Sequence, residues 1–191
     1  MQRVVAINKP KSGNNNKMKY LNALSHESAI DILAALCRDS ELSDRIMAMA
    51  KATLSSVDAD KIAAVVYDRL NAIRVEDLWD NSGRTRYGYR DPTDVAYEML
   101  DDTVSDYTRK MNQYRDLGMY EQEKEYCKGI LTGVLTYGNE GSNEFRDWAP
   151  EDPYTIADYI LDDWIKNHSA DDIEEIQALY DSFFDDEGDE E

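Results

Sequence analysis

The chain has 191 residues, which is long enough to bury a core as one domain or as two small ones. It holds 40 Asp and Glu against 21 Lys and Arg, so its formal net charge is −19. This charge repels phosphate, so it argues against direct nucleic-acid or membrane binding and favours a basic partner. No run of about 18 apolar residues occurs, and the apolar stretch at residues 4–7 is too short for a signal peptide. We therefore expect a cytoplasmic protein.

The charge is unevenly distributed along the chain. Residues 1–24 carry five Lys and Arg and no acid, whereas residues 171–191 carry eleven acids and no base. We therefore expect a flexible basic arm over 1–24, a helical domain over 25–184 and an acidic tail over 185–191. The tail has two interpretations: it keeps the protein in solution, or it docks a basic partner or the arm of the same chain.

Between arm and tail, apolar residues recur at helical spacing almost throughout. Capping residues such as Ser25, Asp58 and Ser169 indicate where helices begin, and Ser169 forms a capping box with Asp172. An Asp-Pro pair indicates the start of two further helices. The predicted helices cover 25–37, 40–54, 58–73, 91–117, 119–137, 152–164 and 169–183, with a short helical turn at 75–79.

Two segments interrupt the helical pattern. Residues 80–90 are predicted to form a loop, because Gly83 and Gly88 interrupt the helical pattern there. Residues 139–149 are predicted to form a polar linker. The helical domain could therefore be subdivided near 80–90 and near 139–150. No strand is expected, except that residues 4–7 could form one.

Two helix starts resemble each other. Residues 91–102 read DPTDVAYEMLDD and residues 152–163 read DPYTIADYILDD, with six of the twelve positions identical. Such an echo is typical of helix hairpins that stack. We therefore predict an all-α fold of stacked antiparallel helix hairpins, either a superhelix like that of tetratricopeptide or HEAT repeats or an irregular helical bundle. Gly129 and Gly133, four residues apart, predict close approach of a neighbouring helix.

Residues 117–131 carry a family resemblance. Leu117-Gly118-Met119-Tyr120 followed by Tyr126-Cys127-Lys128-Gly129-Ile130 resembles the turn and second helix of a tetratricopeptide repeat, with Glu123 where that family has Ala. The resemblance implies helix hairpins that bind other proteins. Residues 88–137 are also faintly similar to helical segments that accompany SWIM zinc fingers. The zinc motif itself is absent, so that likeness implies no metal or nucleic-acid function.

Catalytic and metal-binding motifs are not found. Cys37 and Cys127 form neither a disulfide framework nor a CxxC pair, which fits a reducing compartment. His26 and His168 lie at helix ends, where we expect them to be exposed. Residues 80–91 have the length of an EF-hand loop but hold Thr85 where the sharp turn needs Gly. We expect no catalytic residues, no metal and no cofactor.

The segment from Gly83 to Arg90 is unusual because it concentrates basic and aromatic residues in an acidic chain. Arg and Tyr are enriched at interface hot spots, so its members are candidate partner-binding residues. The candidates are Arg84, Arg86, Tyr87, Tyr89 and Arg90. The alternative is internal: the arginines pair with nearby acids, and the tyrosines wedge between helices.

These observations predict a protein–protein or peptide interaction module. Its partner would be basic or amphipathic and would bind in a helical groove. The sequence is also compatible with a homo-oligomer. One alternative is an acidic nucleic-acid mimic that inhibits a DNA-binding protein, which requires carboxylates spaced like phosphates along one face. Another is an enzyme using carboxylate and Arg chemistry, which requires a deep pocket holding an abnormally titrating acid.

Overall fold

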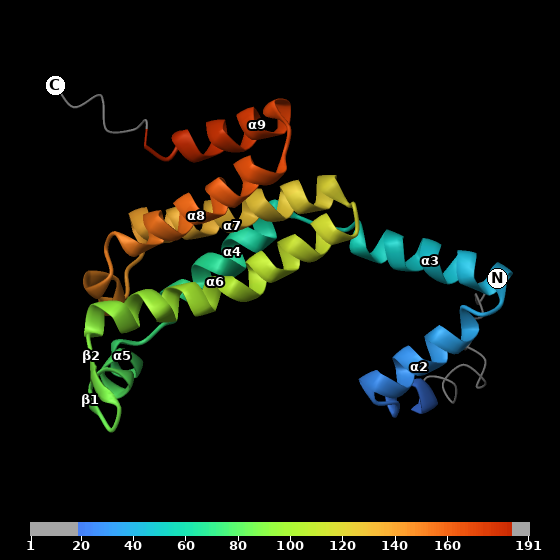
Figure 1. Ribbon diagram of the computed structural model, residues 1–191, viewed down its shortest axis with the longest axis horizontal. Coiled ribbons are helices and arrows are strands. Elements are labelled where there is room, and N and C mark those ends of the chain that lie inside the picture. The colour runs from blue at the N-terminus through green and yellow to red at the C-terminus, as the bar shows by residue number, and fades with distance from the viewer. Residues whose placement is uncertain (1–18, 185–191) are drawn as a thin grey trace, which may run out of the picture. The chain divides into compact units, whose positions relative to one another are not determined.

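The computed structural model describes residues 19–184, which are mostly helical and belong to two compact units (Figure 1). Unit 1 is Met1–Thr53 and unit 2 is Leu54–Glu191. The boundary lies earlier in the chain than the two linker-like segments. The all-α prediction is confirmed, apart from one two-stranded hairpin. Most of the predicted basic arm and the whole acidic tail, 185–191, lie outside the described residues, as does the segment 4–7.

The described part of unit 1 holds helical residues 19–22, helix α2 (His26–Leu36) and helix α3 (Ser40–Leu54, whose last residue begins unit 2). Helix α2 begins at Ser25, the cap expected from the sequence, and α3 begins after Asp39. The Ser25 side chain accepts a hydrogen bond from the Ser28 amide at 3.2 Å, and Asp39 Oδ1 accepts from the amides of Glu41 and Leu42, each at 3.0 Å. These caps define the helix starts without help from packing, and neither helix has a buried residue.

Unit 2 holds seven helical segments and one hairpin among its described residues. In chain order they are α4 (Ala59–Asn71), α5 (Val75–Asn81), β1 (Gly83–Thr85), β2 (Gly88–Arg90), α6 (Pro92–Asp116), α7 (Tyr120–Glu140), the 3₁₀ helix η1 (Glu144–Trp148), α8 (Asp152–Asn167) and α9 (Ala170–Asp181). The Asp58 side chain caps α4 through the Lys61 amide, and Asp91 caps α6 through the Thr93 amide. Gly118, at φ +67°, ends α6 in the left-handed conformation expected of a C-terminal glycine.

Helix α7 lies at the centre of unit 2. It packs against α4, α6, α8 and α9, which come from both sides of it in the sequence (Figure 1). Its inward residues are fully buried and include Cys127, Ile130, Leu131, Val134 and Leu135. Four neighbours leave little of α7 exposed, so this helix organises the core.

The closest packing is between α7 and α4, and two glycines permit it. A Cβ atom added at Gly129 would lie 2.6 Å from Ile62 Cβ, and one at Gly133 would lie 2.7 Å from both the Ala63 carbonyl oxygen and Val66 Cβ. No side chain fits at such distances. The interpretation of Gly129 and Gly133 as a site of close helix approach is therefore confirmed.

The prediction of a loop at 80–90 is wrong in part. Helix α5 extends to Asn81, and residues 83–90 form an antiparallel hairpin in which Arg84 faces Tyr89. Gly83 and Gly88 have φ values of +83° and +134°. Side chains other than hydrogen disfavour such positive φ values, so these two glycines allow the hairpin to form. Strands of three residues are too short to show a period of two in the sequence.

The predicted polar linker at 139–149 is structured. Helix α7 continues to Glu140, and Phe145 in η1 is fully buried. The Asn143 amide nitrogen lies 3.0–3.2 Å from the carbonyl oxygens of Leu70, Asn71 and Ile73, so Asn143 closes the exposed end of α4. A segment that is polar by composition thus ties α4 to the end of α7.

The capping box predicted at Ser169 differs in detail. Ser169 does precede α9, but its hydroxyl donates to Asp172 Oδ2 at 2.8 Å and caps no backbone amide. Among the described residues, no helix is both long enough and apolar enough to cross a membrane.

We predict that Gly133→Ala destabilises the protein although Ala is the better helix former. The added methyl group meets the α4 backbone, and such overpacking costs about 1–3 kcal/mol. Urea unfolding should show this loss, whereas the control Thr132→Ala, at a half-buried neighbouring position, should change stability much less. An unchanged or raised stability of Gly133→Ala would mean that α4 and α7 do not approach this closely.

Candidate functional site

The five candidate residues of the hairpin segment do not gather around a cavity. Tyr87 and Tyr89 are 83% and 70% exposed, so they do not wedge between helices. Arg90 pairs with Glu98 on α6 and donates to the Asn81 carbonyl oxygen at 3.2 Å, which fastens the hairpin to its neighbours. The Arg86 guanidinium lies 4.4 Å from the Tyr87 ring centroid. Arg84, Arg86, Tyr87 and Tyr89 thus remain available to a partner, whereas Arg90 has a structural contact.

A groove between α6 and α8 has the features expected of a binding site for an amphipathic segment. It has a volume of about 190 Å³. Six lining residues come from α6 and four from α8: Asp101, Val104, Ser105, Thr108, Met111, Asn112, Ile156, Tyr159, Ile160 and Asp163. Their spacing of three and four residues places each set on one face of its helix.

The floor of this groove is apolar and its edges are polar or acidic. Val104, Met111, Ile156 and Ile160 are each at most 5% exposed, so they form the floor. Asp101 is exposed at one edge. An apolar floor beneath carboxylates fits a side chain such as Leu or Met that is flanked by Lys or Arg.

Asp163, at the end of the groove, belongs also to a buried ionic cluster. Arg115 Nη2 donates to Asp163 Oδ2 at 2.7 Å, and Arg115 Nε donates to Glu123 Oε1 at 2.6 Å. Glu123 is fully buried. Arg115 therefore bridges a groove carboxylate on α8 and a core carboxylate on α7.

His168 completes the cluster, although its position at a helix end predicted exposure. Its side chain is only 6% exposed, stacks on Trp164 at 3.5 Å between centroids, and places Nε2 3.3 Å from Glu123 Oε2. Nδ1 lies 3.0 Å from the Trp164 carbonyl oxygen, which can only accept, so Nδ1 carries a proton. Neither Nε2 nor Oε2 has another hydrogen-bond partner among the described residues.

A second ionic network joins α7 to α9. Lys124 lies 3.3 Å from Asp172 and 3.1 Å from Glu175, and Lys128 lies 2.5 Å from Glu175. Hydrogen bonds from Lys128 and Lys124 lower the pKa of Glu175, and hydrogen bonds from Ser169 and Lys124 lower that of Asp172. The indole of Trp164 also donates to the Asp172 carbonyl oxygen at 3.2 Å. These contacts fix α9 against the core.

The described residues offer little for nucleophilic or metal chemistry. Burial raises the pKa of the Cys127 thiol, so the reactive thiolate is disfavoured. Residues 19–184 contain no cluster of three or more His, Cys, Asp or Glu that could hold a metal ion. Burial also raises the pKa of Asp152, but this carboxyl group does not line the groove.

Sequence reasoning missed both the groove and the Arg115–Glu123–His168 cluster. The one signal for the cluster was Glu123, a charge at a position where the resembling repeat packs an Ala. A buried Glu requires a partner, but nothing local in the sequence indicates Arg115 or His168 as that partner.

Comparison of the chain with protein-family models, with curated proteins and with solved structures found no match.

We predict that Glu123→Ala is severely destabilising. The substitution removes the buried partner of Arg115 and leaves that guanidinium, which is only 21% exposed, with Asp163 alone. Breaking a buried ion pair typically costs about 3–5 kcal/mol. The matched control is Asp106→Ala, which breaks an exposed Arg109–Asp106 pair on α6 and should cost less than about 1 kcal/mol. The free energy of unfolding in urea measures both, and similar costs would contradict the structural role of Glu123.

We also predict that Glu175 makes the stability pH-dependent. Its pKa is lower in the folded chain than its ordinary value of 4.5, so its contribution is present above that pH and is lost as the pH falls through the folded value. Glu175→Gln should therefore be less stable than the natural chain at pH 7, and the difference should vanish in acid. The control Glu174→Gln, an exposed neighbour, should follow the natural profile throughout.

Proposed function

We propose that unit 2 is an interaction module that binds a basic, amphipathic segment of another protein in the groove between α6 and α8. The observation that carries the proposal is the apolar floor, formed by Val104, Met111, Ile156 and Ile160, next to the carboxylate of Asp101. This combination matches a segment with apolar residues on one face and Lys or Arg beside them.

The charge of unit 2 supports a basic partner. Residues 54–184 contain 29 Asp and Glu against 13 Lys and Arg, a formal net charge of −16. A field of this sign attracts cationic segments and raises their association rate at low salt. The groove then selects by its apolar floor, where Met111 can adapt to side chains of different shape.

The arrangement of helices supports the interpretation as stacked hairpins. α6 and α7 are consecutive packed helices joined by a short turn at Gly118, and α8 and α9 are a second such pair. The groove lies between the first helices of the two pairs, which are also the helices whose starts echo each other in sequence. A surface between neighbouring hairpins is where helical repeats commonly bind peptides.

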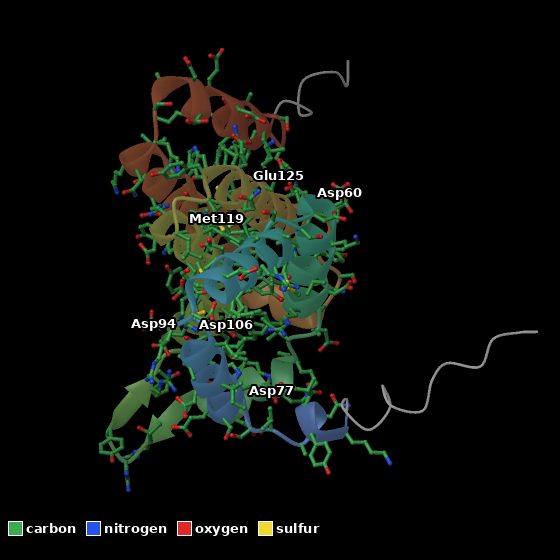
Figure 2. The ribbon with its side chains drawn as sticks, turned by 90° about the vertical axis from the view of Figure 1, so that its right-hand side faces the viewer. Asp60, Asp77, Asp94, Asp106, Met119 and Glu125 are labelled. Carbon is green, nitrogen blue, oxygen red and sulfur yellow. The ribbon has the colours of Figure 1, made fainter. Side chains whose placement is uncertain are left out.

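The nucleic-acid mimic is less well supported by the positions of the carboxylates. Asp60 on α4 and Asp94 on α6 lie at opposite edges of unit 2 in Figure 2. Mimicry of a phosphate backbone requires charges along one face, whereas charge on several sides favours a role in solubility.

A labelled helical peptide with Leu on one face and Lys on the other tests the proposal by fluorescence anisotropy. We expect saturable binding that weakens as salt is added, because cationic side chains contribute. Asp101→Lys should weaken binding about tenfold, since it reverses one charge at the groove. Asp102→Lys, which makes the same change on α6 outside the groove, should have little effect.

Equal effects of the two substitutions would show that only net charge attracts the peptide. Equal binding of a peptide in which Glu replaces Lys would contradict the basic nature of the partner. A failure of the natural chain to bind the Leu–Lys peptide would reject the groove as a site for basic amphipathic segments.

A further inference from the structure

Helix α2 is the most apolar exposed element among the described residues. Seven of its eleven residues are apolar, and none is buried. Ile30, Ile32, Leu33 and Leu36 are each 42–51% exposed. A helix whose apolar residues occupy most of its circumference is normally buried by neighbours on more than one side.

Helix α3 does not bury these residues. It makes few contacts with α2, and its own Met47 and Met49 are 51% and 71% exposed. Isolated helices of 11 and 15 residues are marginal in water, because propagation barely compensates the cost of nucleation. End caps alone do not supply the missing stability, so these two helices need a packing partner.

We infer that this partner is a second copy of the chain, and that α2 and α3 of two copies associate as a four-helix bundle. In such a bundle each helix packs between two others, which is what the broad apolar surface of α2 requires. One contact between identical surfaces thus supplies both missing neighbours at once. This inference is independent of the groove on unit 2.

The distribution of charge favours a second copy over a basic or acidic partner. Residues 25–54 hold five acids and three bases, a net charge of only −2, whereas unit 2 carries −16 over its described residues. Two copies therefore repel least through α2 and α3. Helix α2 contributes Glu27 and Asp31 and no base, whereas α3 contributes two acids and two bases. The acids of α2 can therefore pair with Arg45 or Lys51 of another copy.

A lipid surface fits α2 less well. Helices that lie in a membrane interface usually carry Lys and Arg on their polar face, where these residues meet anionic lipid. The charged residues of α2 are both acidic. The same side chains would repel such a surface, whereas they can pair with α3 of another copy.

Sedimentation of the full-length chain over a range of concentrations tests the inference. We expect the mass to rise from that of one chain, 21.9 kDa, to twice that value as the concentration increases. Leu33→Glu should raise the dissociation constant at least tenfold, because a buried charge opposes association. Leu and Glu have similar helix propensities, so α2 itself is not disfavoured by this change.

Val65→Glu is the matched control. Val65 lies on α4 of unit 2 and is 46% exposed, against 47% for Leu33, and the change adds the same charge. It should leave the association unchanged, as should the apolar substitution Leu33→Met. Circular dichroism of each variant reports whether α2 and α3 stay helical, and the Leu33→Met result separates loss of apolar contact from general fragility of the position.

Several outcomes would overturn the inference. The natural chain could stay at 21.9 kDa at every concentration, or Leu33→Glu could associate as strongly as the natural chain. Equal weakening by Leu33→Glu and Val65→Glu would assign the effect to net charge. A chain that stays monomeric but binds phosphatidylcholine vesicles through Leu33 would replace the second copy with a lipid surface.

Discussion

The close contact between α4 and α7 is the constraint on which unit 2 depends. Gly129 and Gly133 remove two side chains from α7, and the α4 backbone occupies the space they leave. This approach positions α7 so that α6, α8 and α9 can pack around its remaining faces. Packing at this density gains dispersion and burial energy along the whole length of the contact, which is why a single added methyl group matters.

The central position of α7 explains why a charged cluster can persist in the core. Glu123 is surrounded by elements that each bring a polar group: Arg115 from α6 and His168 from the end of α8. The same Arg115 holds Asp163 at the end of the groove. The geometry of the proposed binding surface is therefore coupled to the core, and a change at Glu123 should alter the groove as well as the stability.

The two units use their charge differently. Unit 2 combines an acidic surface with a well-packed interior, which suits a folded module that attracts a basic segment. The helices α2 and α3 are nearly neutral and have exposed apolar side chains, which suits association with another copy. Each surface thus matches its proposed partner in both polarity and charge, and the two surfaces can act independently.

Most helices could be predicted from the sequence because their signals are local. Ser25, Asp58 and Asp91 each cap a helix through an amide two or three residues away, so no distant residue is needed to place the start. The small glycines on α7 likewise indicated a close helix neighbour. In contrast, the strands at 83–90 are too short for a periodic signal, and the structured segment around Asn143 looks polar until its contacts with α4 are known.

The sequence by itself determined where the helices begin, that the fold is all-α, and that the chain is strongly acidic, because capping, periodicity and charge are properties of neighbouring residues. Only the tertiary structure decided which helices line the groove, that Glu123 meets Arg115 and His168, and that α3 does not bury the apolar residues of α2. These features join residues that are far apart in the chain, and their pairing is set by how helices pack rather than by any local pattern.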